Sequence, residues 1–381
     1  RPPALNDSLA QFVDREARSR QMLYSTLEPF REFVAPSREL PDLSWNPFSL
    51  LGDELEREVA RAYGLDGEAA ERVTADTREA LSALGNIEPN EDDASEEELG
   101  VLADWIDRLV SYLMGVALGR WDVRIGSDPT RAPASAGAFT PPSPLPPGML
   151  RDGAGGPAVE VPPSYPVDVP AARLLVDQAG HDWDVSDRVR RAAVAFLGDD
   201  GELDRAVAEA MKKPSLVSYI RGQFFKSHLA TYSKGRRKAP IYWQLQVPSK
   251  AWGIWLYGPK LSREMLFAVV RETEQRQRLA EHQIGHLQRE AESGGGGRKA
   301  SEVAKELEAE QKLAVELASF RAEAERIANL GWEPDLDDGM VLNAAPLADL
   351  FPAWKDAAAY RKELRVGKYE WATVARYADQ L

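Results

Sequence analysis

Few residues in this sequence have the types and spacing that catalysis or metal binding requires. His282 and His286 stand four residues apart, the spacing of two zinc ligands on a helix, but Gln-Ile-Gly separates them and the Glu of an H-E-x-x-H motif is missing. The glycine run 294–297 precedes Arg-Lys, which does not fit the phosphate-binding pattern G-x-x-x-x-G-K-[ST]. We expect a solvated helix face at the histidines, no metal site, and a hairpin tip at the glycines.

Two other groups of polar residues suggest chemistry without completing a pattern. Asp335, Asp337 and Asp338 suggest a nuclease, but no E-x-K or H-N-H partner follows, so we favour a turn that caps neighbouring elements. Asn46-Pro47-Phe48 is similar to the N-P-P-Y motif that clamps a flipped adenine, but one Pro is missing and no F-x-G-x-G loop precedes it. The sequence therefore predicts no catalytic residue and leaves open whether the protein is an enzyme.

The clearest chemical signal is a segment that is basic and contains no acid. From Met211 to Arg263 the chain has eleven Lys or Arg and neither Asp nor Glu, although its net charge is −14. Nine aromatic residues lie in the same segment. Cations interleaved with aromatic rings suit a surface that follows phosphates and stacks on bases. We call residues 211–263 the basic segment and predict that it binds double-stranded DNA.

Individual residues of the basic segment have expected roles. Without acids nearby in the sequence, Arg236, Arg237 and Lys238 lack internal partners, which favours phosphate contact over a merely solvated loop. Trp252 is the candidate exposed ring for stacking, while Trp243 or Trp255 could instead lie in the core on the opposite strand face. The candidate DNA-binding residues are Lys226, Lys234, Arg236, Arg237, Lys238, Tyr242, Lys250 and Trp252.

The length and composition of the sequence indicate a chain of more than one domain. It has 381 residues, of which 44% are hydrophobic and 28% charged, so it can bury a core. It contains no Cys, which excludes disulfides and is compatible with a reducing compartment. No apolar run reaches the length needed to cross a bilayer. We expect a cytoplasmic protein without membrane contact and, because the sequence starts with Arg1, further sequence upstream.

The elements predict a mainly α fold with a smaller α+β part. Residues 1–125 form a helical subdomain with helices expected at 5–33, 53–65, 68–84 and 96–120. The last of these ends at Gly115, Gly119, Arg120 and Trp121, where we favour close packing around a core Trp121 over DNA contact. Residues 126–170 are rich in Pro and Gly and predict an extended connection.

The basic α+β lobe, residues 171–260, follows that connection. A short strand is expected at 173–176 and helices at 185–196 and 202–211. The stretch 241–257, IYWQLQVPSKAWGIWLY, predicts two strands around the turn Pro248-Ser249-Lys250. We expect this aromatic β-hairpin to face DNA.

The rest of the chain predicts a long helical hairpin and a small cap. Residues 261–292 and 299–330 are rich in Glu, Gln, Arg and Ala and flank the glycine run, so residues 261–330 should form an antiparallel hairpin that projects as an arm. Residues 331–381 form the C-terminal cap, with a final helix expected near 369–377.

Several segments taken in order carry a resemblance to a known family. They are LEREVARAYGL (55–65), SYLMGVALGRWD (111–122), SKGRRKAPIYWQL (233–245), LDDGMVLNAAPL (336–347), Trp354-Lys355 and Tyr369-Glu370-Trp371-Ala372. Together they resemble the C-terminal half of the PglX-type adenine-N6 DNA methyltransferases of BREX phage defence. Relatives of that family occur in DISARM and in type IIG restriction-modification systems.

The resemblance implies the target-recognition portion of such an enzyme. In that family the S-adenosylmethionine loop and the N-P-P-Y motif lie upstream of these segments, so we expect no cofactor in this chain and S-adenosylmethionine in the parent methyltransferase. The implied partners are double-stranded DNA, a catalytic domain or subunit, and other phage-defence proteins. The alternative is an interaction scaffold of a defence complex, in which the acidic helices and the long hairpin dock other proteins and DNA contact is incidental.

Overall fold

The chain divides into two compact units, each described by itself. The computed structural model describes residues 28, 33–36, 38, 94–133, 145–198, 203–233, 238–293 and 299–381. The first unit comprises Arg1–Tyr112, Arg124–Met149 and Glu209–Met211, and the second comprises Leu113–Val123, Leu150–Ala208 and Lys212–Leu381. The five-part division expected from the sequence stays a prediction.

The first unit contains most of α4 (Ala94–Ala117), α5 (Val123–Ser127) and a one-turn 3-10 helix, Pro129–Arg131. Helix α4 confirms the helix expected at 96–120. Its buried face packs the ring of Tyr112 edge-on against Phe33, and Ser111 donates a 2.5 Å hydrogen bond to Glu28. The helices expected at 5–33, 53–65 and 68–84, and the Asn46-Pro47-Phe48 turn, lie outside the described residues.

The second unit is organised around a three-stranded antiparallel sheet. The strands are β1 (Leu174–Val176), β2 (Tyr242–Gln246) and β3 (Gly253–Tyr257), in the order β1-β3-β2. The predicted β-hairpin is confirmed, since Tyr242 pairs with Tyr257 and Gln246 with Gly253. Its turn closes through the 3.1 Å bond from Val247 N–H to Trp252 O, with Lys250 at a φ of 62°.

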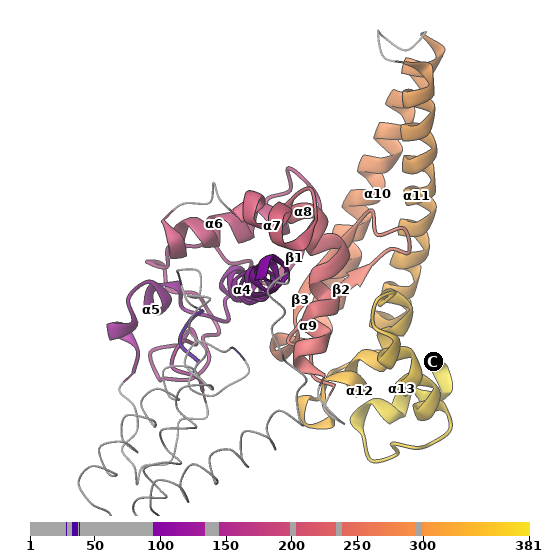
Figure 1. Ribbon diagram of the computed structural model, residues 1–381. Helices are drawn as coiled ribbons and strands as arrows, with labels where there is room; N and C mark the ends of the chain where they lie inside the picture. The colour runs from indigo at the N-terminus through magenta and orange to yellow at the C-terminus, as the bar shows by residue number, and fades with distance from the viewer. Residues whose placement is uncertain are drawn as a thin grey trace, which may run out of the picture. The chain divides into compact units, whose positions relative to one another are not determined.

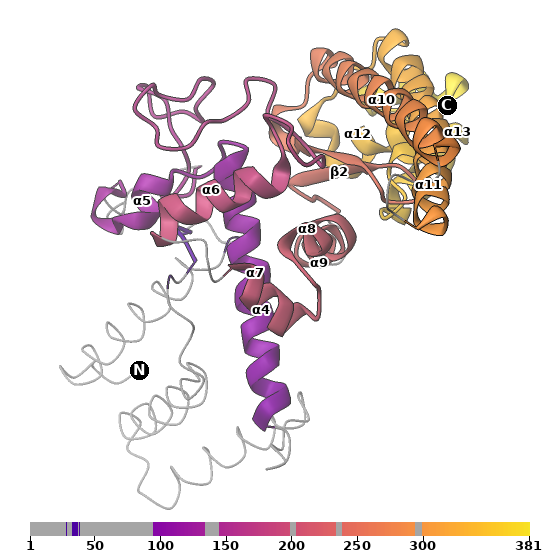
Figure 2. The ribbon, with the colours of Figure 1, turned by 90° about the horizontal axis from the view of Figure 1, so that it is seen from above.

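Among the described residues, five helical elements lie between β1 and β2 in the chain. They are α6 (Val185–Leu197), α7 (Leu203–Met211), α8 (Leu216–Tyr219), a π-helical turn (Ile220–Phe224) and α9 (Phe225–Tyr232). The predicted helices at 185–196 and 202–211 are confirmed, the first ending at Gly198 with a φ of 92°. Seen end on in Figure 2, α8 and α9 form one continuous coil, because the π-helical turn joins them without a break.

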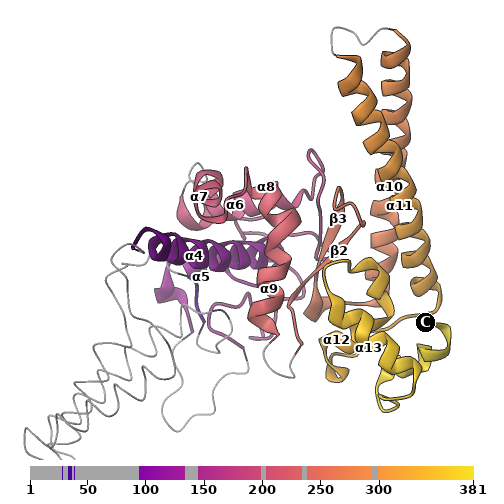
Figure 3. The same cartoon turned by 45° about the vertical axis from the view of Figure 1, so that its right-hand side comes forward.

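Helices and the C-terminal cap cover both faces of the sheet. On one face Trp255 contacts Phe224 and Phe225, at ring-centroid distances of 5.4 and 5.8 Å, and α9 lies beside β2 (Figure 3). On the other face Trp243 meets the rings of Phe351 and Trp354. Every residue of the three strands is buried. The expectation of a DNA-facing sheet is therefore wrong, because the side chains that alternate along these strands pack against other elements on both faces of the sheet.

The long helical hairpin is confirmed as α10 (Arg263–Glu292) and α11 (Ala300–Asn329), which lie side by side in Figure 1. Its basal half belongs to the packed unit, since Phe320 meets Trp252 at 5.5 Å between ring centroids. Buried side chains become sparse toward the end of the hairpin where α10 and α11 are connected. The expectation of a projecting arm therefore applies to this distal half only. None of the helices in the described part of the chain has the length and apolarity to cross a membrane.

The C-terminal cap consists of short helices. In chain order they are a 3-10 turn (Leu336–Asp338), α12 (Met340–Ala344), a 3-10 helix (Ala345–Leu350), α13 (Lys355–Arg365) and a 3-10 helix (Thr373–Gln380). The final helix expected near 369–377 begins later than expected and is a 3-10 helix. Gly367, with a φ of 75°, ends α13, and Ala372 is extended before the 3-10 helix begins.

Candidate nucleic-acid interface

A buried arginine joins two of the segments that carry the family resemblance. Arg120, which follows α4, is 7% exposed, and its Nη1 donates hydrogen bonds to the hydroxyls of Tyr242 at 3.1 Å and Tyr232 at 3.4 Å. Its guanidinium carbon lies 4.0 Å from the ring centroid of Trp121. Phenolic oxygens and π faces stabilise this buried charge. We call Arg120, His228, Tyr232 and Tyr242 the arginine-histidine cluster.

His228 is the central ring of this cluster. It is 3% exposed on α9 and lies between Tyr232 and Tyr242, with centroid distances of 4.6 and 4.8 Å. Its Nε2 accepts hydrogen bonds from the backbone N–H groups of Ile241 at 3.0 Å and Tyr242 at 3.1 Å. Burial, and secondarily the charge of Arg120, hold the pKa of His228 well below its usual value. The imidazole is therefore neutral with its proton on Nδ1, which has no partner among the described residues.

Two glycines let the end of α4 approach its neighbours closely. A Cβ on Gly115 would come within 2.3 Å of both Trp121 Cδ1 and the Tyr242 hydroxyl, so a side chain there would displace the cluster. Gly119 has a φ of 72°, and a Cβ there would overlap the guanidinium of Arg173. That guanidinium donates a 3.1 Å hydrogen bond to Leu118 O, one of the carbonyls at the helix end that need a partner from outside the helix. The expectation of close packing around a core Trp121 is confirmed, since Trp121 is fully buried.

The arginine-histidine cluster fixes both ends of the basic loop, residues 233–238. The loop leaves Tyr232 at the end of α9 and returns to Tyr242 on β2, and both rings contact His228. Ala239 N–H donates a 3.2 Å hydrogen bond to Tyr232 O and closes the stem. Lys234, Arg236 and Arg237 lie outside the described residues. Their DNA contact stays a prediction, but the chain that carries them begins and ends at ordered positions.

Two cations of the basic segment have internal partners, and for one of them, Lys238, this is contrary to expectation. Lys238 Nζ lies 3.7 Å from Asp356 on α13. Arg221 makes a bidentate pair with Asp177, both bonds at 2.7 Å, and this pairing raises the pKa of Arg221. The inference that Lys238 lacks an internal partner was wrong, because both carboxylates come from segments distant in the sequence. Lys238 is therefore held at the base of the loop.

The two aromatic candidates are also corrected. Trp252 and Tyr242 are fully buried, one against Phe320 and the other in the arginine-histidine cluster, so neither can stack on a base. Their place in the hairpin explains this result, because both faces of the sheet are covered. Our sequence reasoning did not single out His228. The spacing of Phe224, His228 and Tyr232 at intervals of four residues, on one helix face, could have indicated it.

The remaining described cations of the basic segment form no ion pair with the described residues. They are Lys212, Lys213, Lys226, Lys250, Lys260 and Arg263. Lys212, Lys226 and Arg263 are exposed, and Lys250 is half-buried at the hairpin turn. Burial, and then the charge of Arg173, lower the pKa of Lys260. Lys226 on α9 and Lys250 are the candidates that remain available to phosphates.

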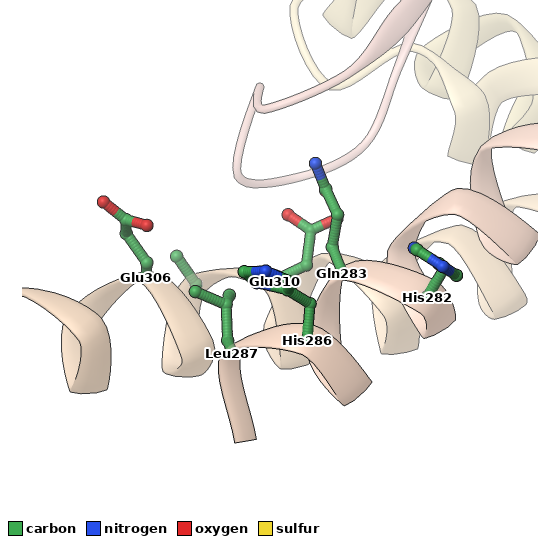
Figure 4. Close-up of a pocket in the computed structure, with 7 residues that line it drawn as sticks. His282, Gln283, His286, Leu287, Glu306 and Glu310 are labelled. Carbon is green, nitrogen blue, oxygen red and sulfur yellow. The ribbon is translucent and has the colours of Figure 1, made fainter. Parts of the chain in front are cut away.

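A pocket on the helical hairpin brings the two histidines near carboxylates. His282, Gln283, His286 and Leu287 of α10 and Glu306, Ala309 and Glu310 of α11 line it, as Figure 4 shows for the labelled side chains. Its volume is about 500 Å³. His286 Nδ1 lies 3.9 Å from Glu290 on its own helix, and Glu310 pairs with Arg276 at 2.7 Å. In the described part of the chain, no group of three or more His, Asp or Glu could hold a metal ion.

Two of the three carboxylates of the C-terminal cap, those of Asp335 and Asp338, act as structural acceptors. Asp335 Oδ1 accepts from Asp337 N–H at 3.0 Å, and its Oδ2 accepts from the Thr373 hydroxyl at 2.9 Å. Asp338 accepts from Val374 N–H, and the buried Asn343 receives the 2.8 Å bond from Asp335 N–H. The capping interpretation is confirmed for Asp335 and Asp338, because their oxygens tie the start of the cap to its end.

Comparisons with known proteins support a distant link to methyltransferases. The sequence matches no family model. It is 26% identical over 180 residues to the adenine-specific methyltransferase PglX of Lacticaseibacillus casei (strain Zhang). The match covers 44% of this chain and 15% of the relative, so the chain spans a small part of the length of that protein. The chain is thus distantly similar to one part of an adenine-specific methyltransferase.

Proposed function

We propose that this chain is a DNA-binding and target-recognition part of an adenine-specific methyltransferase system. The basic loop and the exposed lysines near it contact the phosphates of double-stranded DNA. Catalysis and the binding of S-adenosylmethionine belong to another part of the same system. Double-stranded DNA and that catalytic part are the proposed partners, and other phage-defence proteins are candidates. The similarity to PglX supports the methyltransferase link.

The observation that carries the proposal is the distribution of charge. In a chain of net charge −14, six described cations of the basic segment have no carboxylate within ion-pair distance among the described residues. Cations that stabilise no internal carboxylate are available to an external polyanion, which gains affinity by releasing its counterions. Because the remainder of the chain is acidic, this segment is where a polyanion would approach.

The arginine-histidine cluster supports the proposal through rigidity. A loop that positions phosphates must keep its ends in place, since contact geometry decides register on the duplex. Here the stem is held by the Ala239 to Tyr232 backbone bond, by the two bonds to His228 Nε2 and by the Lys238–Asp356 pair.

Direct binding tests the proposal. The full chain is titrated into a labelled mixed-sequence duplex at several salt concentrations between about 50 and 200 mM, the range over which phosphate contacts weaken strongly. We expect an affinity that falls linearly with salt on logarithmic axes. Absence of binding at the lowest salt, by a chain shown to be folded by circular dichroism, would contradict the proposal and favour the scaffold alternative.

A further inference from the structure

In the part of the chain that the structure describes, three residues other than glycine have a left-handed backbone, and all three are basic. Their φ angles are 51° at Arg173, 50° at Lys212 and 62° at Lys250. In this region the Cβ of an L-residue crowds the backbone, so glycine usually occupies it. Lys and Arg make up 47 of the 381 residues, so three cations at three such positions are not expected by chance. Each side chain should have a use that offsets the strain.

Arg173 has such a use inside the fold. Its guanidinium is buried and donates hydrogen bonds, between 2.9 and 3.3 Å long, to the carbonyl oxygens of Leu118, Gly119, Ala158 and Val159. One side chain thus ties the end of α4 to the segment that leads to β1. These bonds satisfy carbonyls that would otherwise lack partners, which offsets the strain at Arg173. This residue needs no external ligand to explain it.

Lys250 has no comparable internal use. Its N–H donates a 2.9 Å bond to Val247 O, so it directly follows the turn of the β-hairpin, where a left-handed residue is usually glycine. Glu316 of α11 lies nearby and accepts a 3.2 Å bond from Ser249 N–H. The Lys250 side chain nevertheless forms neither an ion pair nor a hydrogen bond with Glu316 or any other described residue. Its ammonium group is therefore available to a ligand.

Lys212 stands directly after α7, at the position where a left-handed glycine commonly ends a helix. The preceding helix α6 follows that rule, since it ends at Gly198. Leu216 N–H donates a 2.7 Å bond to Asp204 of α7 and so fixes the connection that contains Lys212, but the Asp204 carboxylate pairs with Arg190. The Lys212 side chain is exposed and makes no ion pair or hydrogen bond within the described ranges.

We infer that Lys212 and Lys250 are phosphate contacts that the fold keeps at a cost in stability. This inference rests on the proposed function, and it identifies which unpaired cations hold the DNA backbone. A lysine ammonium binds phosphate as a point charge and gains affinity through counterion release, whatever the base sequence. Glycine at either position would give a more stable chain that binds DNA less well. These opposite effects distinguish a lysine that binds a ligand from one that is only tolerated.

The test measures thermal stability and duplex binding of Lys212→Gly and Lys250→Gly in the full chain. Each substitution should raise the thermal midpoint by about 2 °C, because it relieves the left-handed strain. Each should also weaken binding to a mixed-sequence duplex and flatten the slope of log affinity against log salt by about one. Lys212→Arg and Lys250→Arg keep both charge and strain, so their midpoints and slopes should match wild type. Lys305→Ala, at an exposed lysine of α11, is the matched control and should leave the slope unchanged.

The outcomes separate this inference from the proposed function. If the wild-type chain binds no duplex at about 50 mM salt, the proposed function itself fails. If it binds and both folded glycine variants keep its affinity and slope, the inference is overturned and the proposed function stands. A loss confined to one variant assigns the contact to that lysine and overturns the inference for the other. Glycine variants that are less stable than wild type contradict the strain argument, whereas higher stability with a flatter slope supports the inference.

Discussion

Arg120 Nη1 donates a 3.1 Å hydrogen bond to the Tyr242 hydroxyl across 122 positions of sequence, and both groups are buried. The bond joins the end of α4 to the first residue of β2. His228, stacked on Tyr242, binds the backbone immediately before and within the same strand. The start of β2, and with it the end of the basic loop, is therefore positioned by buried polar contacts.

Tyr242→Phe should destabilise the fold without removing the loop. The ring and its stack on His228 remain, but the buried Arg120 loses a hydroxyl acceptor and keeps the longer bond to Tyr232. A buried donor left short of a partner costs about 1–3 kcal/mol in the free energy of unfolding. Urea denaturation measures this loss. Thr231→Ala, at an exposed position of α9, is the control, and equal stability of Tyr242→Phe and wild type would show that the bond is unimportant.

The buried His228 should make stability depend on pH. Its folded-state pKa is depressed, so below the unfolded-state value of about 6.5 the unfolded chain binds a proton that the folded chain does not. The free energy of unfolding should then fall, as pH decreases from about 6.5, by up to about 1.4 kcal/mol per pH unit. His228→Gln keeps an acceptor but does not titrate. Its stability should lack this component in urea titrations at pH 7.5 and 5.5.

His181 should change the pH dependence of stability in the opposite direction to His228. Its Nε2 lies 3.2 Å from Glu272 on α10, and this hydrogen bond raises the pKa of the imidazole. The stabilisation from this pair is present below the unfolded-state pKa and is lost as pH rises through the folded-state value. Glu272→Gln should therefore steepen the loss of stability on acidification, whereas His228→Gln should reduce it. The same direction of change in both variants would contradict these assignments.

Substitution of Trp252 should lower the stability of the fold and leave DNA affinity unchanged. It is fully buried and packs edge-on against Phe320 of α11, so Trp252→Ala should cost about 3–5 kcal/mol in the free energy of unfolding. The milder Trp252→Phe should fold and bind a duplex with wild-type affinity. A folded Trp252→Phe variant with clearly weakened DNA binding would restore this residue to the interface.

The sequence allowed correct prediction of elements with strong local signals. The β-hairpin at 241–257 and the two long helices follow from alternation, turn residues and a repeated helical pattern. The final helix was expected to start too early, since Gly367 and the extended Ala372 interrupt the chain before the 3-10 helix begins, and so short a pattern does not specify the helix type. Local periodicity does not indicate what an element packs against.

The candidate site was harder to predict because its partners are distant in sequence. Nothing near Lys238 indicates Asp356, and nothing near Arg221 indicates Asp177, so the acid-free segment suggested more unpaired cations than the structure has. Trp252 was expected to be exposed because a hairpin strand has two faces and the sequence does not show that both are covered. The buried contact between Arg120 and Tyr242 likewise required the tertiary structure.

The salt dependence of duplex binding by the Arg236→Ala, Arg237→Ala double variant tests the central claim most directly. Each phosphate contact contributes about 0.9 to the slope of log affinity against log salt, so losing two contacts should flatten the slope by roughly two and weaken binding to all sequences. Arg271→Ala, Arg289→Ala, at two exposed arginines of α10, is the matched control of equal charge. A folded loop variant with the wild-type affinity and slope would contradict the account and remove the basic loop from the DNA interface.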